Sequence, residues 1–326
     1  MSTQLRAVSV AETLKDSYKS IRSIFGSYIK EGDLTLLFGD SNCGKSALAC
    51  DIAMAVAYGT NHFGNEIETK VRGKVLIFDL ENNDSQFYSR YANSPMASDT
   101  SDMIKRVCSV DITDVDAFTG ELVKMLDEYE PVLVVFDNIT KVETKLRVPL
   151  MERFKCILKS YETSFLVISH TIKRKLEKPI DQNDIRGSKN VIDFVDAAFG
   201  IGLCADKVSK YIKHVKSRSC EKIVEVAKVK LETAPYLHFE FMEWADENDL
   251  LKCMGDSRSK EIFGPKDLHK AVMLKREGHS IREISDKLGK SKSTVQRKLA
   301  EYEEKNSTES DNSKRKKSKE VMTESI

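Results

Sequence analysis

One short stretch of the chain has the residue types and spacing that bind a phosphate group. It fits G-x-x-x-x-G-K-[ST], in which the glycines let the backbone turn so that successive N–H groups point at an anion. The lysine would reach the β- and γ-phosphates of a nucleotide, and the final hydroxyl would be a ligand of Mg²⁺. These features predict a nucleotide-binding loop. The loop consists of Gly39, Asp40, Ser41, Asn42, Cys43, Gly44, Lys45 and Ser46.

Two carboxylates follow apolar runs further along the chain. Asp137 ends the run 132–136, and downstream of a phosphate loop an acid in this place holds Mg²⁺ through its water shell. Glu81 lies just past the run 74–80, where a carboxylate can polarise the water that attacks the γ-phosphate. An exposed acid at a strand end is the alternative for Glu81. Asp79, one step back, is the weaker candidate for the same role.

Further polar residues at strand ends could contact the terminal phosphate. His170 follows the run 164–168, and its ring could touch the γ-phosphate and report its loss, although a lone histidine is more often structural. Lys216 and Arg218 are a cationic pair at a strand end. In a ring assembly such a pair can reach the γ-phosphate of the neighbouring subunit. The alternative for this pair is an ordinary basic turn.

A basic segment after His170 has few long apolar residues to bury. It predicts a mobile loop suited to the phosphate backbone of DNA, and a solvated surface loop is the alternative. Its candidate contacts are Lys173, Arg174, Arg186 and Lys189.

Alternating strands and helices would position these residues. The short apolar runs are typical of strands buried on both faces of a parallel sheet, and the later runs predict an antiparallel extension. The spacing of apolar residues predicts helices over 47–58, 114–129 and 151–161. The predicted strands are 33–38, 74–80, 105–110, 131–136, 164–168, 198–202, 210–217, 223–231 and 236–244.

Residues 280–299 have the layout of a helix-turn-helix. Ser280 and Glu283 form a capping-box pattern, and Gly289 supplies the turn before a helix that begins near Ser291. The second helix would lie in the major groove of DNA. A small protein-interaction domain is the alternative. The residues expected to face DNA are Lys292, Ser293, Gln296 and Arg297.

These patterns divide the chain of 326 residues into four parts. A capping-box pattern and amphipathic spacing predict a helical lead-in at 1–30. The nucleotide-binding core would occupy 31–250 and the helix-turn-helix 261–304. Residues 305–326 are polar and basic, which predicts a disordered tail that adds nonspecific attraction to phosphates.

Composition narrows the class of protein. The 52 Lys and Arg nearly balance the 51 Asp and Glu. A nucleic acid would therefore have to bind to local basic patches, because the chain as a whole carries almost no net charge. No apolar stretch approaches the ~18 residues that span a bilayer, and we expect a cytoplasmic protein without a membrane partner. The seven cysteines include no C-x-x-C pair, which favours neither a disulfide framework nor a zinc site.

Taken together, residues 20–245 resemble the RecA-type ATPase core, nearest to the replicative helicases represented by plasmid RepA and bacterial DnaB. The resemblance implies an α/β fold, a RecA-like P-loop NTPase core with a mostly parallel central sheet, to which the helix-turn-helix adds a small all-α domain. It implies ATP as the nucleotide, Glu81 as general base, His170 as γ-phosphate sensor, and Lys216 and Arg218 as trans-acting fingers. It also implies a homo-oligomeric ring, usually a hexamer, with the loop 172–190 on single-stranded DNA.

The sequence departs from this family in two places. Asn138 follows Asp137, where some relatives carry a second carboxylate, and Ser219-Cys220 replaces the glycine after the finger motif. Three functions remain open at this point. The chain could be a ring helicase or translocase for replication or mobile-element maintenance, an ATP-dependent DNA-binding regulator, or a filament-forming recombination mediator.

Overall fold

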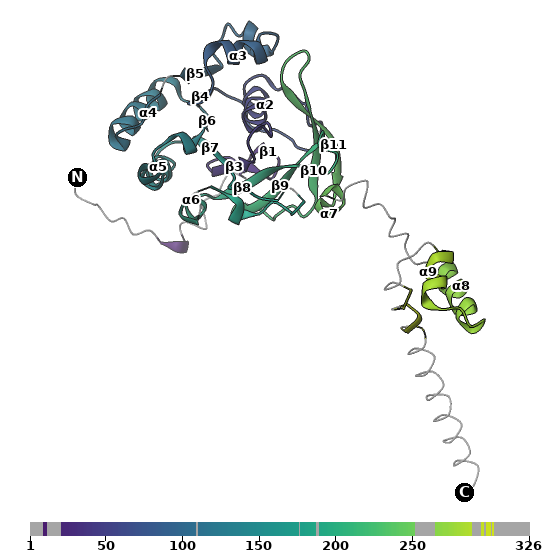
Figure 1. Cartoon of the computed structure of the whole chain (residues 1–326). Coiled ribbons are helices and arrows are strands. Elements are labelled where there is room, and N and C mark those ends of the chain that lie inside the picture. Colours follow the sequence, from purple (N-terminus) through teal and green to yellow (C-terminus); the bar gives the residue numbers. More distant parts are fainter. Residues whose placement is uncertain are drawn as a thin grey trace. The chain divides into compact units, whose positions relative to one another are not determined.

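A computed structural model describes residues 9–11, 21–108, 110–175, 177–186, 189–251, 265–288, 295–296, 298–300 and 302 (Figure 1). The chain divides into two compact units, residues 1–252 and residues 253–326. Each unit is described by itself. Of the helices within the described residues, none has the length and apolar character needed to cross a bilayer.

A nine-stranded sheet forms the centre of the first unit, in the order β11-β10-β9-β8-β3-β7-β6-β4-β5. The strands from β8 to β5 in this order run parallel to one another, whereas β9, β10 and β11 are antiparallel. The parallel strands are β3 (Leu34–Gly39), β4 (Val75–Asp79), β5 (Ile104–Cys108), β6 (Leu133–Asp137), β7 (Ser164–His170) and β8 (Ala197–Leu203). The antiparallel strands are β9 (Lys210–Ser217), β10 (Val226–Glu232) and β11 (His238–Ala245). These are the strands that the apolar runs predict.

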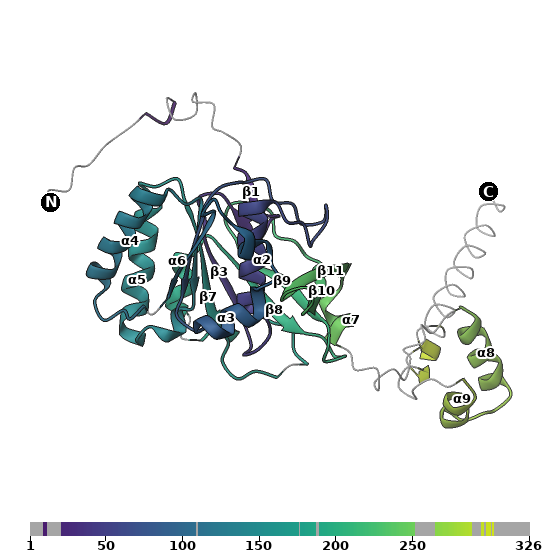
Figure 2. The same ribbon diagram turned by 90° about the horizontal axis from the view of Figure 1, so that it is seen from above.

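Helices cover both faces of the sheet (Figure 2). On one face, α4 (Val115–Tyr129), α5 (Thr144–Ile157) and α6 (Lys189–Phe194) pack over a core that includes Leu36 and Phe38. On the other face, α2 (Lys45–Tyr58) packs over a core that includes Leu37. Successive residues of a strand point to opposite faces, so burial on both sides requires an unbroken apolar run.

The expected helical lead-in differs from the structure over residues 21–30. Here the chain forms β1 (Ser23–Phe25) and β2 (Ile29–Lys30), which pair antiparallel around Gly26. Gly26 has φ +49°, a left-handed conformation that ends a helix. Ile24, Phe25, Tyr28 and Ile29 are all buried against the α2 face of the sheet. Tertiary packing therefore overrides the local helical pattern, and residues 12–20 lie outside the described residues.

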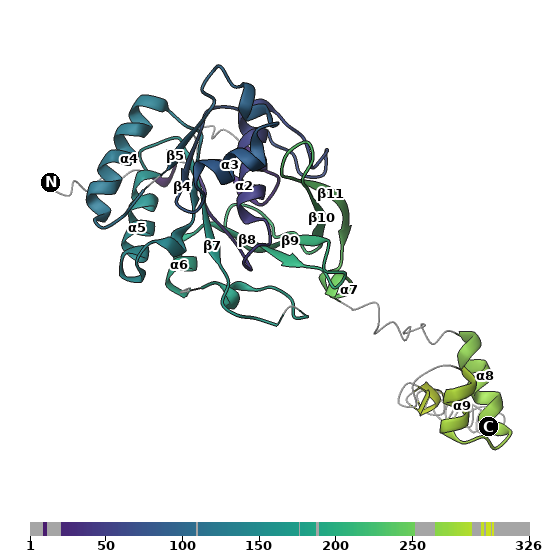
Figure 3. The same cartoon turned by 45° about the horizontal axis from the view of Figure 1, so that its top comes forward.

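Two smaller helices complete the first unit. The helix α3 (Asp84–Tyr91) follows β4, and α7 (Glu247–Leu251) follows β11. Figure 3 shows α3 beside the start of α2, at the edge of the sheet where the parallel strands end. The helix expected at 151–161 begins earlier, at Thr144, and includes Pro149. Its buried Leu150, Met151, Phe154 and Ile157 have helical spacing and pack on the sheet.

The second unit has the small core that the helix-turn-helix pattern predicts. The helices α8 (Pro265–Arg276) and α9 (Ile281–Leu288) contact helical residues near 295–300. The Ser280 backbone N–H donates to Glu283 Oε2 at 2.8 Å, and the Glu283 N–H donates to Ser280 Oγ at 3.3 Å, so the expected capping box is formed. The predicted turn at Gly289 lies outside the described residues. The core consists of Ala271, Val272, Leu274, Ile281, Ile284, Leu288, Val295 and Leu299.

His214 is a buried ionisable group in the core beneath the β1–β2 hairpin. Its side chain is fully buried, its ring centroid lies 5.3 Å from that of Tyr28, and Nδ1 accepts a hydrogen bond from the Ile223 N–H. Burial, with Lys222 and Lys30 nearby, lowers the pKa of His214 from 6.5 to about 4. The folded chain therefore keeps this imidazole neutral over a range where the unfolded chain protonates it.

Acid should destabilise the core through His214. Between about pH 6.5 and 4 the unfolded state binds the extra proton, so stability falls as the pH falls through this window, by about 2 kcal/mol from pH 7 to 5. The variant His214→Phe should lack this contribution and show a flatter pH dependence. The free energy of unfolding at each pH can be measured by urea unfolding, followed by the fluorescence of Trp244, the single tryptophan. If the free energy of unfolding depended on pH in the same way in both proteins, the assignment of this pH dependence to His214 would be wrong.

Candidate functional site

The phosphate loop joins β3 to α2 in the geometry that its glycines require. Asn42 has φ +62° and Gly44 has φ +96°, both left-handed, and α2 begins at Lys45. A Cβ atom at Gly44 would lie 2.7 Å from a ring carbon of Phe239, so a side chain has no room there. Buried Lys45 donates to the carbonyl oxygens of Gly39, at 3.1 Å, and Asp40, at 2.7 Å. The loop thus presents backbone amides and one ammonium group together at a helix N-terminus.

Strand register brings the other candidates to the same edge of the sheet. Asp79 at the end of β4 pairs with Asp137 at the end of β6, and Gly39 at the end of β3 pairs with His170 at the end of β7. In open parallel sheets, ligands bind at this carboxyl edge. The strand order therefore brings together residues that are far apart in the chain, such as Gly39 and His170.

Asp137 is 4% exposed and accepts a hydrogen bond from the Ser46 hydroxyl. Its Oδ1 atom has no hydrogen-bond partner in the part of the chain that the structure describes. Burial raises the pKa of Asp137 to about 7, and the neighbouring carboxylates of Asp79 and Glu81 act in the same direction. A buried carboxylate with an unused oxygen beside a hydroxyl is a donor set that fits Mg²⁺.

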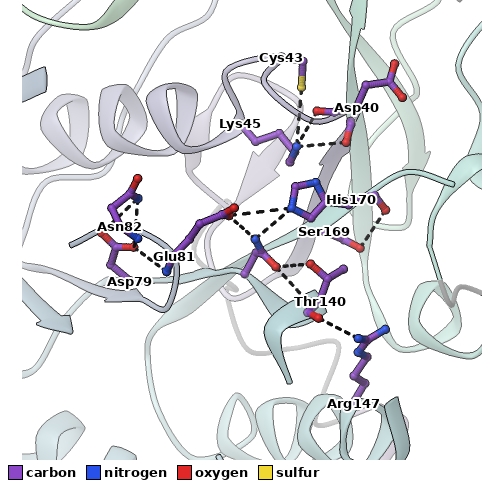
Figure 4. A network of polar contacts seen from close by, with 12 residues as sticks. Asp40, Cys43, Lys45, Asp79, Glu81, Asn82, Thr140, Arg147, Ser169 and His170 are labelled. Carbon is purple, nitrogen blue, oxygen red and sulfur yellow. Dashed lines mark hydrogen bonds and ion pairs between the residues drawn. The ribbon is translucent and has the colours of Figure 1, made fainter. Parts of the chain in front are cut away.

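Figure 4 shows Glu81, His170 and Thr140 converging on one point below Lys45. The residue between them is Asn138, whose Nδ2 lies 2.5 Å from Glu81 Oε2 and 3.3 Å from His170 Nε2. The Glu81 carboxylate lies 3.9 Å from His170 Nε2. Burial, with Lys45 nearby, lowers the pKa of His170, so its ring is neutral at neutral pH.

Asp79 holds the turn that carries Glu81. Its Oδ1 accepts hydrogen bonds from the backbone N–H groups of Glu81, at 3.1 Å, and Asn82, at 2.9 Å. Its Oδ2 lies 3.0 Å from Arg106 Nε. The two carboxylates at and just after the end of β4 therefore differ in role, because Asp79 is buried and fully engaged whereas Glu81 lines the cavity.

A cavity of about 660 Å³ opens beside the phosphate loop, a size that suits a nucleotide. Leu231 and Leu237, on the β10–β11 hairpin, give it an apolar wall. The Leu237 N–H donates to the Arg90 carbonyl oxygen at 3.0 Å, which ties this hairpin to α3. The cavity is lined by Ser41, Asn42, Gly44, Lys45, Ser46, Ala47, Glu81, Asn82, Gln86, Arg90, Lys141, His170, Leu231 and Leu237.

The sequence did not predict several of the residues that line this cavity. Asn82, Gln86 and Arg90 come from α3 and the turn before it, and Arg90 donates to Asn82 Oδ1 at 2.6 Å. The capping box between Asn83 and Gln86 is the local signal that would have revealed this helix. Lys141 ends the short 3-10 turn Ile139–Lys141 after β6, and its backbone N–H donates to the Asn138 carbonyl oxygen at 3.2 Å.

Arg174 differs from its expected role as a DNA contact. Its side chain is 4% exposed, and its Nε lies 3.2 Å from Asp40 Oδ2 of the phosphate loop. The Thr171 hydroxyl donates to the other oxygen of the same carboxylate. Arg174 therefore supports the phosphate loop, whereas Lys173 and Arg186 are exposed. The side chain of Lys189 lies outside the described residues.

Lys216 and Arg218 lie far from the phosphate loop of their own chain. Lys216 pairs with Ala198 near the start of β8, whereas Gly39 pairs with Ile201 near the end of that strand. Lys216 Nζ donates to the Ile192 carbonyl oxygen at 2.6 Å, and Arg218 Nη2 donates to that of Asp193 at 3.0 Å. The register thus places the pair toward the amino-terminal end of β8, away from the phosphate loop at the carboxyl edge.

The turn after this pair is held by a hydrogen bond. The Ser219 hydroxyl donates to Asp33 Oδ1 at 2.6 Å, so the residue that replaces the expected glycine has a defined partner. In the second unit, Gln296 is helical and exposed, as expected for a residue that faces DNA. The other three candidate DNA contacts, Lys292, Ser293 and Arg297, lie outside the described residues.

Comparison with known proteins agrees with the site and with the second unit. Residues 2–145 match the model of a family described as an AAA domain. Residues 267–309 match a family described as a homeodomain-like domain. The core is thus an α/β domain with a mostly parallel sheet and a phosphate loop between β3 and α2, and its first part is similar to an AAA domain. The second unit is a small helical domain similar to homeodomain-like domains.

Solved structures and curated proteins provide two further comparisons. A solved KaiC-like protein from the archaeon Pyrococcus horikoshii is 15% identical, with a TM-score of 0.49, over 69% of this chain and 99% of that one. No curated protein matches the sequence significantly.

Replacing Arg174 should weaken nucleotide binding, whereas replacing its neighbour Lys173 should weaken DNA binding. Without the guanidinium, the Asp40 carboxylate stands uncompensated beside the phosphates, so Arg174→Ala should lower ATP affinity about tenfold. Lys173→Ala should leave ATP affinity unchanged and reduce the salt dependence of binding to single-stranded DNA by about one charge. Titrations with a fluorescent nucleotide and a labelled oligonucleotide test both. If both variants changed the affinities for nucleotide and for DNA in the same way, the distinction between Arg174 and Lys173 would be refuted.

Proposed function

We propose that the protein is an ATP-hydrolysing, DNA-associated ring, a RepA-like helicase or translocase. The observation that carries the proposal is the convergence of Lys45, Glu81 and His170 on one cavity at the carboxyl edge of the sheet, with buried Asp137 at the end of β6 on the same edge. This set supplies a cation for the phosphates, a metal-binding acid, a base and a polar contact for the terminal phosphate.

The reaction is the transfer of the γ-phosphoryl group of ATP to water. The amides of the loop and Lys45 hold the β- and γ-phosphates, and Ser46 and Asp137 would hold Mg²⁺, which neutralises charge on the phosphate oxygens when bound. Glu81 is the general base that accepts a proton from the attacking water. His170 contacts the γ-phosphate and changes its contacts when the phosphate leaves.

A second subunit completes the site in this proposal. Lys216 and Arg218 are at the sheet edge opposite the nucleotide cavity, so any contact of theirs with ATP comes from a neighbouring copy of the chain. A head-to-tail ring places this edge of one subunit against the carboxyl edge of the next. The cations would then stabilise the charge that develops in the transition state.

Two regions would bind DNA. Lys173 and Arg186 are exposed, Lys173 follows His170 by three residues, and the Arg186 N–H donates to the His170 carbonyl oxygen at 2.9 Å, an arrangement that suits the backbone of a single strand. The helix-turn-helix suits duplex DNA, because residues 260–305 carry twelve Lys and Arg against eight Asp and Glu. This unit would deliver the motor to its site, as in replication or the maintenance of a mobile element.

The helix-turn-helix also favours an alternative, an ATP-dependent DNA-binding regulator or recombination mediator without unwinding activity. ATP turnover with and without single-stranded DNA, together with strand displacement on a forked duplex, separates the two. Stimulated turnover with unwinding supports the motor. Turnover with duplex binding alone supports the regulator and refutes the helicase.

The lysine and arginine substitutions should act in different ways. Lys45→Ala should abolish ATP hydrolysis, and Arg218→Ala should leave ATP bound but unhydrolysed. Equal mixing of the two inactive variants should restore roughly a quarter of wild-type turnover, because that fraction of random interfaces joins an intact loop to an intact finger. Phosphate release measures the turnover of each variant and of their mixture. Normal turnover of Arg218→Ala, or no recovery in a mixture shown to co-assemble, would remove the trans assignment.

Removal of residues 261–326 should lower the affinity for duplex DNA while sparing ATP hydrolysis. The deletion takes away the major-groove helix and the basic tail but no residue of the nucleotide cavity. A shorter deletion of residues 305–326 separates nonspecific tail attraction from helix-turn-helix binding. Fluorescence anisotropy of a labelled duplex provides the measurement. Unchanged duplex affinity after the longer deletion would refute DNA binding by this unit.

A further inference from the structure

Asn138 occupies the centre of the polar network in the nucleotide site. It follows the metal-binding candidate Asp137 directly, and it is fully buried. Its side chain contacts the general base, the phosphate sensor and Thr140 through both ends of its amide.

Thr140 determines which way the Asn138 amide points. The Thr140 backbone N–H lies 3.0 Å from Asn138 Oδ1, and the Thr140 hydroxyl also donates to this oxygen. A backbone N–H can only donate, so the atom that faces it must be the amide oxygen. The NH₂ group must therefore point toward Glu81 and His170.

Thr140 itself is anchored from α5. Arg147 Nη2 donates to the Thr140 carbonyl oxygen at 2.8 Å, and Arg147 Nε donates to that of Val142 at 2.9 Å. Figure 4 shows Arg147 reaching this turn from the helix below it. The orientation of the amide is thus fixed by the backbone N–H and hydroxyl of Thr140, whose turn Arg147 holds from α5.

The fixed amide dictates the protonation of His170. The two N–H bonds of Asn138 are directed at Glu81 Oε2 and His170 Nε2, and an NH₂ group cannot accept, so Nε2 must be the unprotonated nitrogen. The ring is neutral, and its single proton is therefore on Nδ1. The Nδ1 atom has no hydrogen-bond partner among the residues that the structure describes. It is the donor left for an oxygen of the terminal phosphate.

The same amide orients Glu81. The Oε2 atom is held at 2.5 Å from Nδ2, and the backbone of Glu81 is held by Asp79. The Glu81 carboxylate is about one-third exposed, so without Asn138 it would be free to rotate into solvent. A misplaced base costs catalysis even when its chemistry is unchanged.

We propose that Asn138 is a positioning residue that selects the Nδ1–H tautomer of His170 and aims the Glu81 carboxylate, so that one buried amide sets both groups. The proposal rests on the proposed function for the roles of those two residues. The tautomer itself does not depend on hydrolysis and can be measured without nucleotide.

The tautomer is tested by ¹⁵N magic-angle-spinning NMR of the full-length protein labelled at histidine, with the His170 signals identified by their loss in His170→Gln. Wild type should show a protonated Nδ1 and an unprotonated Nε2 at neutral pH. Asn138→Asp keeps the shape and the acceptor for Thr140 but offers His170 only an acceptor, so the proton should move to Nε2. A wild-type Nε2–H tautomer, or the same tautomer in the variant, would overturn the proposal.

Turnover provides the second readout. Asn138→Ala and Asn138→Asp should each lower kcat for ATP about 10- to 100-fold while KM stays within about twofold, because the phosphate loop is untouched. Asn93→Ala, the same substitution at an exposed position on the chain, should match wild type. Unchanged kcat in both Asn138 variants would overturn the proposal. A wild-type protein without ATP hydrolysis would instead refute the proposed function and leave the tautomer result standing.

Discussion

The concentration of charge at the carboxyl edge of the sheet is the constraint on which the rest of the structure depends. Asp79, Asp137 and Lys45 are each no more than 6% exposed, and burying a charge is costly unless it is paired. Burial, with Asp79 and Glu81 nearby, raises the pKa of Asp137 to about 7 even though Lys45 is close. A buried carboxylate of this kind suits a site that receives a divalent cation together with phosphate anions.

The structure separates groups of one chemical type by giving them different partners. Asp79 is engaged by two backbone amides and Arg106, and so it fixes a turn. Among the residues that the structure describes, Asp137 keeps an oxygen without a partner, and the Glu81 carboxylate is held at its Oε2 atom. The same separation applies to the basic residues, because buried Arg174 is committed to Asp40 whereas Lys173 remains exposed.

Local sequence predicts those parts of the molecule that local physics determines. The phosphate loop, the apolar strands and the small core of the helix-turn-helix follow from spacing over a few residues, and all are found in the structure. The parallel order of strands follows from the alternation of strand and helix. That order is enough to place Glu81, Asp137 and His170 near the loop.

What the sequence did not reveal depends on contacts between distant residues. Arg174 lies 134 positions from Asp40, so nothing local marks it as a partner of the phosphate loop. The β1–β2 hairpin replaces an expected helix because its apolar residues are needed on the α2 face of the core. The Asn138 amide contacts Glu81, which lies 57 positions earlier in the chain, and Thr140 sets its direction, so the residue type alone indicates no more than an absent carboxylate.

The most direct test of the central claim is a comparison of Mg²⁺-dependent ATP binding and phosphate release between wild type and Glu81→Gln. The substitution keeps the size of the side chain and removes the base. Wild type should bind and hydrolyse ATP, while the variant should bind ATP with similar affinity and release at most about one-hundredth as much phosphate. A wild-type protein with no saturable affinity for ATP, or a variant that hydrolyses it at the wild-type rate, would contradict the account.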